Sequence, residues 1–585
     1  MLVMDLAAAS VSFASLAFQL FQGCVQGISF FNTAQHMGTD GSLFRAGLEF
    51  EKYRLITWAS KAGLLEDDST PGPRVNWQLA TMILEHLMGI LTSAEKLQNR
   101  YMLDVSEETV QESERALAIN PPKQGLAKFI CRLKPNIYTT SGKIIQANNG
   151  PLKRLRWATV GKDKSTRITR DIHNLVDKLE YLLDSADRES RRNEDVRLLR
   201  DLVSFTTTTT EIGELDGILE DGIGSSSSER AIKAAAYVKQ IRLVLGADQR
   251  EDEVRTVPTP ESRKIMPQLR NIKKTLKPWS GTDLRYSGIE FARYNGRQVI
   301  VQWKVAEGQA WEKYQVQMKS LVVLLMSFSH KSFRSLRCLG YYPAEDRGRH
   351  GIVFSAPNED FSWSMKSLSQ LIEEEMYVSL SRRVAIAQAL GETLLQLHTA
   401  GWMHKSLRSE NIVFLAHEGS KNEDFLRSDP FVMGYDYARP DTADAAAAFT
   451  QLPETELSAE LYRHPQAQGL NRETYQKRFD VYALGCLVVE LAFWQKLVDI
   501  QATSTAEDLV GNIAKATESN DTIRIPSLFD LLENDEVVKS IRHLVGERIV
   551  EVISTCCYIA KSKNGQEASL DEQQIVAEKL SQCKL

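Results

Sequence analysis

The stretch WMHKSLRSENIVFL, residues 402–415, brings His404, Ser406 and Asn411 close together in sequence, and one chemistry to consider for such polar residues is phosphoryl transfer onto a hydroxyl group. In that chemistry a carboxylate orients and deprotonates the attacking hydroxyl, while two further side chains hold the bridging metal ions. Asn411 is a suitable metal ligand, but Ser406 offers only a hydroxyl group. A serine hydroxyl without a neighbouring base cannot accept the proton. The stretch therefore has the outline of a catalytic loop without its base.

Four segments beyond residue 279 resemble those of a protein kinase and occur in the same order. QVIVQWK is similar to the strand whose final lysine, here Lys304, pairs with nucleotide phosphates. HKSLRSEN is similar to the catalytic loop, and FVMGYDYARP carries Gly434 where the metal-binding aspartate is expected. RFDVYALGCLVVEL is similar to the buried helix that follows, with Asp480 matching. The resemblance covers residues 279–585 and implies an α+β protein-kinase-like fold.

The departures from the kinase pattern remove most of its chemistry. Ser406 replaces the base and Gly434 replaces one metal ligand, so the resemblance implies a pseudokinase with no catalytic residue and no metal. Lys304 and Asn411 are retained as candidates for residual nucleotide binding, although a scaffold role explains Lys304 equally well. By spacing, the partner of this lysine would be Glu312 or Gln317. An atypical active kinase remains an alternative, in which the serine would be dispensable.

The segment PDTADAAAAFTQLPETELSAELYRHP occupies the place of a kinase activation segment. Its candidate sites for phosphorylation by an upstream kinase are Thr442, Thr450, Thr455 and Ser458. A phosphate adds nearly two negative charges and could pair with Arg439 or Arg463. For each of the four residues, an unmodified loop position is the alternative interpretation.

Length and composition limit the remaining possibilities. A chain of 585 residues is too long for one hydrophobic core and predicts roughly two to four domains. Its net charge of -5 argues against a general nucleic-acid binder. The seven cysteines form no CxxC pair and no zinc spacing, which favours a reducing, cytoplasmic location. The start MLVMDL lacks the basic residues of a secretory signal.

The composition and the apolar periodicity of the sequence predict three parts. Residues 1–200 show apolar residues at helical spacing and indicate an all-α helical bundle. Residues 201–278 begin with a Thr-, Gly- and Ser-rich stretch typical of a flexible connection and continue with one or two bridging helices. Residues 279–585 begin with β-rich runs and continue with helical segments, which is the order of an α+β domain.

The predicted first helix is amphipathic, but its polar side carries no charge. No Asp, Glu, Lys or Arg occurs from Leu6 to Thr39, and Ser and Gln recur every three or four residues from Ser12 to Ser29. A helix that enters lipid is better served by Ser and Gln than by charged residues. The residues predicted to form a membrane-insertion helix are Phe13, Leu16, Gln19, Leu20, Gln22 and Gln26. A bundle helix with a thin solvated edge is the alternative.

Basic residues are concentrated in one segment of the N-terminal part. Residues 123–170 contain twelve Lys or Arg against one acid, which makes this segment +11. Such a cluster gains about 1 kcal/mol per residue at an anionic leaflet. The residues predicted to contact anionic lipid are Lys153, Arg154, Arg156, Trp157, Lys162 and Lys164. RNA binding is less favoured because aromatic platforms are scarce in the segment.

The N-terminal part resembles the HeLo family of fungal cell-death domains. The resemblance covers about residues 5–200 and includes the uncharged first helix, FEKYRLITWASKAGLL and KRLRWATVGKDKSTRITRDIHNLVDKL. In that family the first helix is implied to enter or permeabilise the membrane.

A HeLo-like bundle followed by bridging helices and a pseudokinase resembles the mixed-lineage kinase domain-like proteins, the executioners of necroptotic death. This order implies a cytoplasmic effector that moves to the plasma membrane on activation. The pseudokinase would restrain the bundle until a signal allows it to oligomerise on anionic lipid. The alternative is a pseudokinase scaffold whose helical region binds a partner protein.

Overall fold

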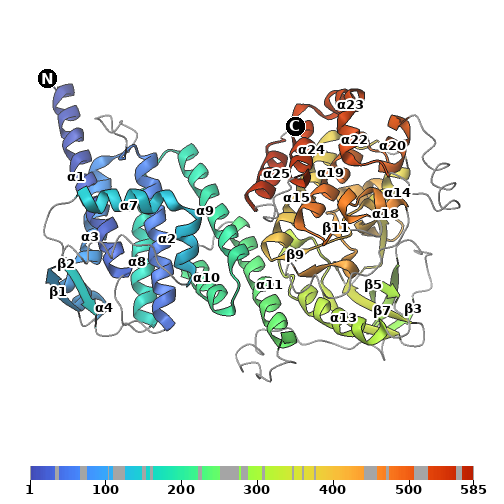
Figure 1. Ribbon diagram of the computed structural model, residues 1–585, viewed down its shortest axis with the longest axis horizontal. Helices are drawn as coiled ribbons and strands as arrows, with labels where there is room; N and C mark the ends of the chain where they lie inside the picture. The colour runs from blue at the N-terminus through green and yellow to red at the C-terminus, as the bar shows by residue number, and fades with distance from the viewer. Residues whose placement is uncertain are drawn as a thin grey trace. The chain divides into compact units, whose positions relative to one another are not determined.

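The computed structural model describes residues 2–32, 39–65, 75–102, 105–109, 125–147, 153–157, 162–221, 227–250, 276–278, 288–305, 310–344, 348–358, 361–374, 377–440, 457–468, 473–505, 525–561 and 570–583. Its chain forms two compact units, Met1–Ala236 and Tyr237–Leu585. Helices make up most of the N-terminal unit, and the C-terminal unit combines strands with helices (Figure 1). The helical character predicted for the N-terminal part is confirmed.

The helices that begin in the N-terminal unit are α1 (Leu2–Asn32), α2 (Thr39–Lys61), α3 (Trp77–Thr92), α4 (Ala94–Tyr101), α6 (Gly125–Leu133), α7 (Pro135–Ala147), α8 (Lys162–Glu180), α9 (Ser185–Phe205), α10 (Thr209–Asp221) and α11 (Ser227–Arg250). Polar side chains begin several of them. Asn76 accepts a hydrogen bond from the Leu79 N–H at the start of α3, and Asp184 accepts one from Asp187 at the start of α9. These caps satisfy backbone donors that have no partner within the helix.

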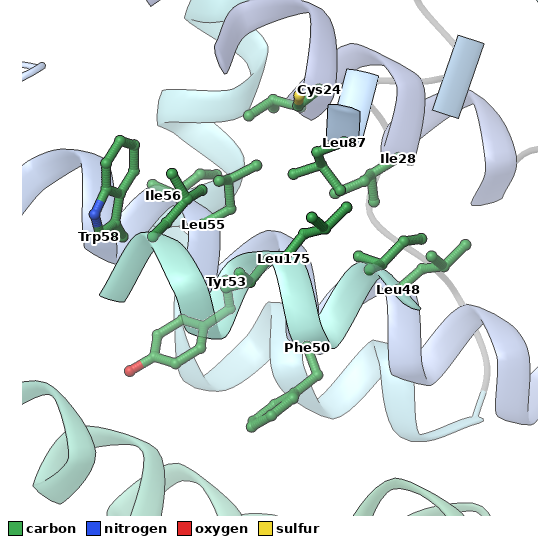
Figure 2. Close-up of a cluster of buried hydrophobic side chains, with 14 of the residues drawn as sticks. Cys24, Ile28, Leu48, Phe50, Tyr53, Leu55, Ile56, Trp58, Leu87 and Leu175 are labelled. Atoms are coloured by element: carbon green, nitrogen blue, oxygen red, sulfur yellow. The ribbon is translucent and has the colours of Figure 1, made fainter. Parts of the chain in front are cut away.

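Helix α2 runs through the middle of the N-terminal unit and packs against α1, α6, α8, α9 and α10. Its apolar side chains Leu48, Phe50, Leu55 and Trp58 are buried in one core cluster (Figure 2). Because neighbours surround it, α2 also buries four charged side chains, Glu49, Glu51, Lys52 and Arg54. Buried charges require partners, so this helix must be the centre of an ion-pair network.

A two-stranded antiparallel ribbon corrects the expectation of an all-α N-terminal part. Strand β1 (Val105–Thr109) pairs with β2 (Lys153–Trp157), and Glu108 lies opposite Arg154 in the register. The strands are separated by more than 40 residues of sequence that include α6 and α7. Local periodicity does not report such a distant pairing, which is why the ribbon was not predicted.

The Thr-, Gly- and Ser-rich stretch after residue 200 is more ordered than predicted. It contains the end of α9 and the helix α10, whose Ile212, Leu215 and Leu219 belong to the core of the N-terminal unit. Thr208 accepts a hydrogen bond from the Glu211 N–H, and the Glu211 carboxylate accepts one from the Thr207 N–H. This capping arrangement and the three buried apolar side chains stabilise a helix despite the low complexity of the sequence.

The C-terminal unit contains a five-stranded antiparallel sheet in the order β3 (Leu276–Pro278), β4 (Ile289–Tyr294), β5 (Arg297–Val305), β7 (Arg349–Ser355) and β6 (Cys338–Ala344). A two-residue turn joins β4 to β5, with φ values of 52° at Asn295 and 80° at Gly296. Asn-Gly favours this hairpin turn because both residues tolerate positive φ.

The rest of the C-terminal unit is mainly helical. Its helices are α13 (Ala310–Met326), α14 (Leu368–Glu373), α15 (Leu380–Thr399), α16 (Asn422–Arg427), α18 (Leu457–Leu461), α19 (Lys477–Phe493), α20 (Leu497–Thr505), α22 (Leu528–Glu533), α23 (Asp535–Val545), α24 (Glu547–Lys561) and α25 (Leu570–Gln582). Its short strands are β8 (Trp363–Ser367), β9 (Trp402–Met403), β10 (Ile412–His417), β11 (Phe431–Val432) and β12 (Arg439–Pro440). Helix α19 is buried along nearly its whole length and packs against α15 and α24. The predicted combination of strands and helices is confirmed for this unit, and its sheet is antiparallel.

Candidate functional site

A buried carboxylate organises the segment that the sequence identified as a degenerate catalytic loop. Asp480 on α19 accepts hydrogen bonds from the backbone N–H groups of His404 at 2.8 Å and Lys405 at 2.9 Å. His398 and the Tyr475 hydroxyl bind the same carboxylate at 3.1 and 2.8 Å. Burial raises the pKa of Asp480, but the bond from His398 and the other contacts more than offset this, so the net pKa is lowered. The loop is thus held by an ionised carboxylate.

The two polar residues of the loop bind each other. Asn411 is buried, and its Nδ2 donates to the Ser406 carbonyl at 2.7 Å and to the Ser406 Oγ at 2.9 Å. The Ser406 hydroxyl, which was predicted to stand where a kinase has its base, accepts a hydrogen bond here. Within the described ranges, no three His, Cys, Asp or Glu side chains are grouped so as to hold a metal ion.

The geometry at Gly434 disfavours any side chain there. Its φ is 83°, and its N–H donates to the Gln302 Oε1 at 3.1 Å. A Cβ atom at this position would lie 2.3 Å from the Asn411 Nδ2. An aspartate could therefore enter only if the Asn411 amide moved away from Ser406.

Restoring the aspartate is expected to destabilise the C-terminal unit rather than rebuild a metal site. Gly434→Asp combines a positive φ, which adds about 1–3 kcal/mol of strain, with the overlap at Asn411. Thermal unfolding with and without Mg²⁺ measures both effects. Gly419→Asp is the matched control, because Gly419 has the same φ of 83° and open space around its Cβ. Stabilisation of Gly434→Asp by Mg²⁺ would contradict this prediction.

Lys304 lies on β5 beneath an aromatic ring. Its side chain is 9% exposed, and its Nζ is 3.4 Å from the centroid of the Tyr437 ring. This distance is within the range of a cation–π interaction. Gln317, one of the two predicted partners of Lys304, is exposed, so the expectation that Gln317 pairs with the buried lysine is wrong. The side chain of the other predicted partner, Glu312, lies outside the described residues. A phosphate approaching Lys304 from the Tyr437 side would have to displace this ring.

Helix α11 contributes a buried arginine next to the same loop. Arg242 lies in the part of α11 that belongs to the C-terminal unit, and its Nη1 donates to the Gly401 carbonyl at 3.2 Å. Gly401 follows α15 and directly precedes β9, so the guanidinium lies at the negative end of the α15 dipole. The predicted bridging helix is thereby attached to the start of the degenerate catalytic loop.

Three of the four predicted phosphorylation sites, Thr442, Thr450 and Thr455, lie outside the described residues. Ser458 is half-buried near the start of α18. Arg463, one of its proposed phosphate partners, forms an ion pair with Glu460. Phosphorylation therefore stays a prediction for all four residues.

The predicted membrane-insertion helix divides into an exposed half and a buried half. Gln19 is exposed, Leu16 is 43% exposed, and Phe13 and Gln22 are partly buried. Leu20 lies in the core, and Gln26 is 2% exposed. The uncharged stripe is therefore a surface only in its first half, which corrects the interpretation of one continuous polar face. Among the described residues, no helix is long and apolar enough to cross a membrane.

Two glycines bring α1 unusually close to α3. A Cβ atom at Gly23 would lie 2.8 Å from the Met88 sulfur, and one at Gly27 would lie 2.8 Å from the Leu91 Cβ. The Cys24 thiol donates to the Leu84 carbonyl across the same contact at 3.5 Å. The buried half of α1 is thus held by close backbone approach as well as by apolar burial.

Filling this contact is expected to loosen α1. Gly27→Ala should lower the free energy of unfolding by about 1–3 kcal/mol because the new methyl group overlaps Leu91. Gly213→Ala on α10 is the matched control, since nothing lies within 4 Å of its Cβ position, and it should raise stability by about 0.5–1 kcal/mol. Urea denaturation compares the two variants. Equal effects would mean that close approach at Gly27 does not matter.

The residues predicted to contact anionic lipid come from two elements. Lys153, Arg154, Arg156 and Trp157 belong to β2, while Lys162 and Lys164 begin α8. The pairing with β1 places Glu107 opposite Leu155 and Glu108 opposite Arg154. These two acids lie outside the basic segment 123–170, and they lower the net positive charge of the ribbon. Lys164 is exposed, and its Nζ donates to the Met102 carbonyl at 2.7 Å.

An ion-pair network inside the N-terminal unit was not predicted from sequence. Arg54 on α2 contacts Glu51 at 3.2 Å and Glu180 at 2.6 Å, and it also pairs with Asp177. Arg191 on α9 pairs with Glu180 and Asp195. The network joins α2, α8 and α9 within the buried interior. A local signal was the presence of the charged residues Glu51, Lys52 and Arg54 among the apolar and aromatic residues of FEKYRLITW.

The same network fixes the charge of a histidine. Burial lowers the pKa of His173, but Glu51 at 2.8 Å and Asp177 at 3.4 Å raise it to about 10, so the imidazole is protonated at neutral pH. Burial raises the pKa of Glu180 to about 7 despite the attraction of Arg54 and Arg191. Cations and carboxylates are nearly balanced in this interior.

Residues 9–211 match the model of the HeLo family, which is described as prion-inhibition and propagation. The match begins within α1 and ends within α10, and it includes Arg54 and the carboxylates that bind it. No curated protein matches the chain. The predicted resemblance of the N-terminal part to this family is thus confirmed by the match over residues 9–211.

Proposed function

We propose that this protein is a regulated cell-death effector in which a non-catalytic, kinase-like C-terminal unit controls a HeLo domain that permeabilises membranes. The match to the HeLo family is the observation that carries the proposal, because this family is associated with prion-related and cell-death signalling in fungi. Activation would place oligomers of the chain on anionic lipid at the plasma membrane. Nucleic acid has no role in this proposal.

The absence of catalysis in the C-terminal unit is part of the proposal. It is supported by Ser406 at the predicted position of the base and by the Asn411 amide, which binds Ser406 and leaves no room for a side chain at Gly434. The Tyr437 ring over Lys304 supports a site that does not bind Mg·ATP. Thermal unfolding should therefore be unchanged by Mg·ATP. A stabilisation that disappears in Lys304→Met would favour the atypical kinase instead.

Control of one unit by the other is proposed to act through α11. Ile232 and Ala236 in its first half belong to the core of the N-terminal unit, and Arg242 in its second half binds Gly401 within the C-terminal unit. A signal that moved the segment around Gly401 would act on the same helix that completes the HeLo core. Phosphorylation by an upstream kinase in residues 442–458 is one such signal.

Dye release from vesicles tests the proposed function. Residues 1–236, checked for folding by circular dichroism, should release dye from phosphatidylserine-containing vesicles more strongly than the full chain does. Gln19→Lys, which places a charge on the exposed half of α1, should abolish release. Asn193→Lys on α9 adds the same charge at another exposed position and should leave release unchanged.

Absence of release by the folded fragment would reject membrane permeabilisation. The protein would then be better described as a scaffold that binds a partner protein through its helical unit.

A further inference from the structure

Helix α3 presents an exposed stripe that joins apolar side chains to a histidine. Leu79 is 42% exposed, Met82 is 62% exposed, and His86 is also exposed. Their spacing of three and four residues places them on one side of the helix. Exposed apolar side chains of this size are normal singly, but these two lie one turn apart on the same side of one helix.

Cations gather at the histidine end of this stripe. Arg100 and Lys96 on α4 and Lys178 on α8 are all exposed, and all three lower the pKa of His86 together with its partial burial. Asp171 is the acid that opposes them there, and it is already bound by Arg100 at 2.9 Å and by the Tyr101 hydroxyl at 2.6 Å. The surface formed by these residues, here named the α3–α4–α8 face, comprises Leu79, Met82, His86, Lys96, Arg100 and Lys178.

The contact between His86 and Arg100 suits a neutral imidazole. The Arg100 Nη1 is 3.3 Å from the His86 Nε2. A guanidinium can only donate hydrogen bonds, so this contact is a hydrogen bond when Nε2 carries its lone pair, as in the neutral tautomer with its proton on Nδ1. A proton arriving from solvent at Nε2 would break this contact, release the Arg100 N–H groups and add one positive charge to the face.

The chemistry of the face selects the kind of partner. Phosphate and carboxylate groups would satisfy the three cations and the released Arg100 donors. Exposed Leu79 and Met82 beside them suit the boundary between lipid headgroups and acyl chains, whereas a nucleic-acid backbone would leave both apolar side chains in water. An anionic lipid surface therefore matches both halves of the face.

We propose that the α3–α4–α8 face docks on an anionic lipid surface and that His86 takes up one proton when it docks. This inference rests on the proposed membrane function and assigns the docking to residues outside the β2 segment. An anionic surface favours the protonated imidazole, so the proton and the lipid bind cooperatively. Docking therefore strengthens as pH falls.

Vesicle sedimentation of the full chain tests the proposal. Binding to phosphatidylcholine vesicles should require added phosphatidylserine and should strengthen by about fivefold between about pH 7.5 and about pH 5.5, the effect of one added charge. His86→Gln keeps an acceptor for Arg100 but cannot take up a proton, so it should lose this pH dependence. Replacing Arg100 and Lys178 by Gln should weaken binding by about fivefold for each cation. Lys143→Gln, an exposed lysine on α7, should bind like the wild type.

Three results would overturn the inference: equal binding to neutral vesicles, the same pH dependence in His86→Gln, or wild-type binding after loss of Arg100 and Lys178. The outcome is separable from that of the proposed function, which is measured by dye release. Release with unaffected binding of the face variants would leave the function standing and reject the face. If binding follows the expected pattern but residues 1–236 release no dye, the α3–α4–α8 face stands and the proposed membrane permeabilisation is rejected.

Discussion

Arg54→Ala is expected to unfold the N-terminal unit or to lower its free energy of unfolding by about 3–5 kcal/mol. The guanidinium is buried and contacts the carboxylates of Glu51, Asp177 and Glu180. Removing it leaves the buried carboxylate of Glu51 and the largely buried carboxylate of Glu180 with Arg191 and protonated His173 as the remaining cations in the network. Breaking one partner of a buried ion pair is more damaging than removing both, because the charge left behind is not solvated.

Chemical denaturation followed by circular dichroism measures this effect. Arg188→Ala on α9 is the control. The hydrogen bond that the Arg188 side chain donates to the Tyr181 carbonyl is exposed and long, at 3.3 Å. That change should shift stability by less than about 1 kcal/mol. A similar small shift for Arg54→Ala would show that water or the neighbouring cations can replace the guanidinium.

The stability of the C-terminal unit is expected to fall as pH rises from about 4.5 to about 8. Burial raises the pKa of Glu490 on α19 from 4.5 to about 8, although contacts with Tyr462 and the Leu497 N–H lower it in part. In this pH window the folded unit keeps the Glu490 proton, whereas the unfolded chain releases it. The unfolded state is therefore stabilised relative to the folded state as pH rises, by a total on the order of a few kcal/mol. The loss of stability levels off above the folded-state pKa.

Glu490→Gln should remove this dependence. The amide is neutral at every pH and keeps an oxygen for the Leu497 N–H, which the carboxylate accepts at 2.8 Å. The variant should be more stable than the wild type at about pH 8 by up to a few kcal/mol. Urea denaturation across the pH range compares them, with the exposed Glu536→Gln as the control that should retain the slope. Parallel slopes in wild type and Glu490→Gln would assign the pH dependence to other groups.

Several features of the candidate site were predictable from residue type and spacing. Ser406 and Gly434 were predicted to replace a base and a metal ligand because the required chemistry depends on which functional group stands at each position, and this stays a prediction. Asp480 was singled out in the predicted buried helix, and it accepts bonds from the His404 and Lys405 N–H groups. Asn295 and Gly296 likewise form a hairpin turn that their own conformational preferences select.

The burial of individual side chains on α1 was not predictable from the local sequence. The stripe from Ser12 to Ser29 has one periodicity along its whole length, yet Gln19 is exposed and Gln26 is in the core. Periodicity reports the angle of a residue around its helix, but it does not report how far along the helix a neighbour extends. The cover over the second half of α1 comes from α3 and depends on the glycines at 23 and 27.

By itself, the sequence determined the helical character of the N-terminal unit, its likeness to the HeLo family and the presence of Ser406 and Gly434 in the loop segments. These depend on local periodicity and on side-chain chemistry, which each residue carries with it. Only the tertiary structure decided that Tyr437 covers Lys304, that Arg54 meets carboxylates from another helix, and that β1 brings acids to β2. These contacts join residues far apart in the chain. Buried charges and backbone groups need partners, and the packing of distant segments decides which partners lie within reach.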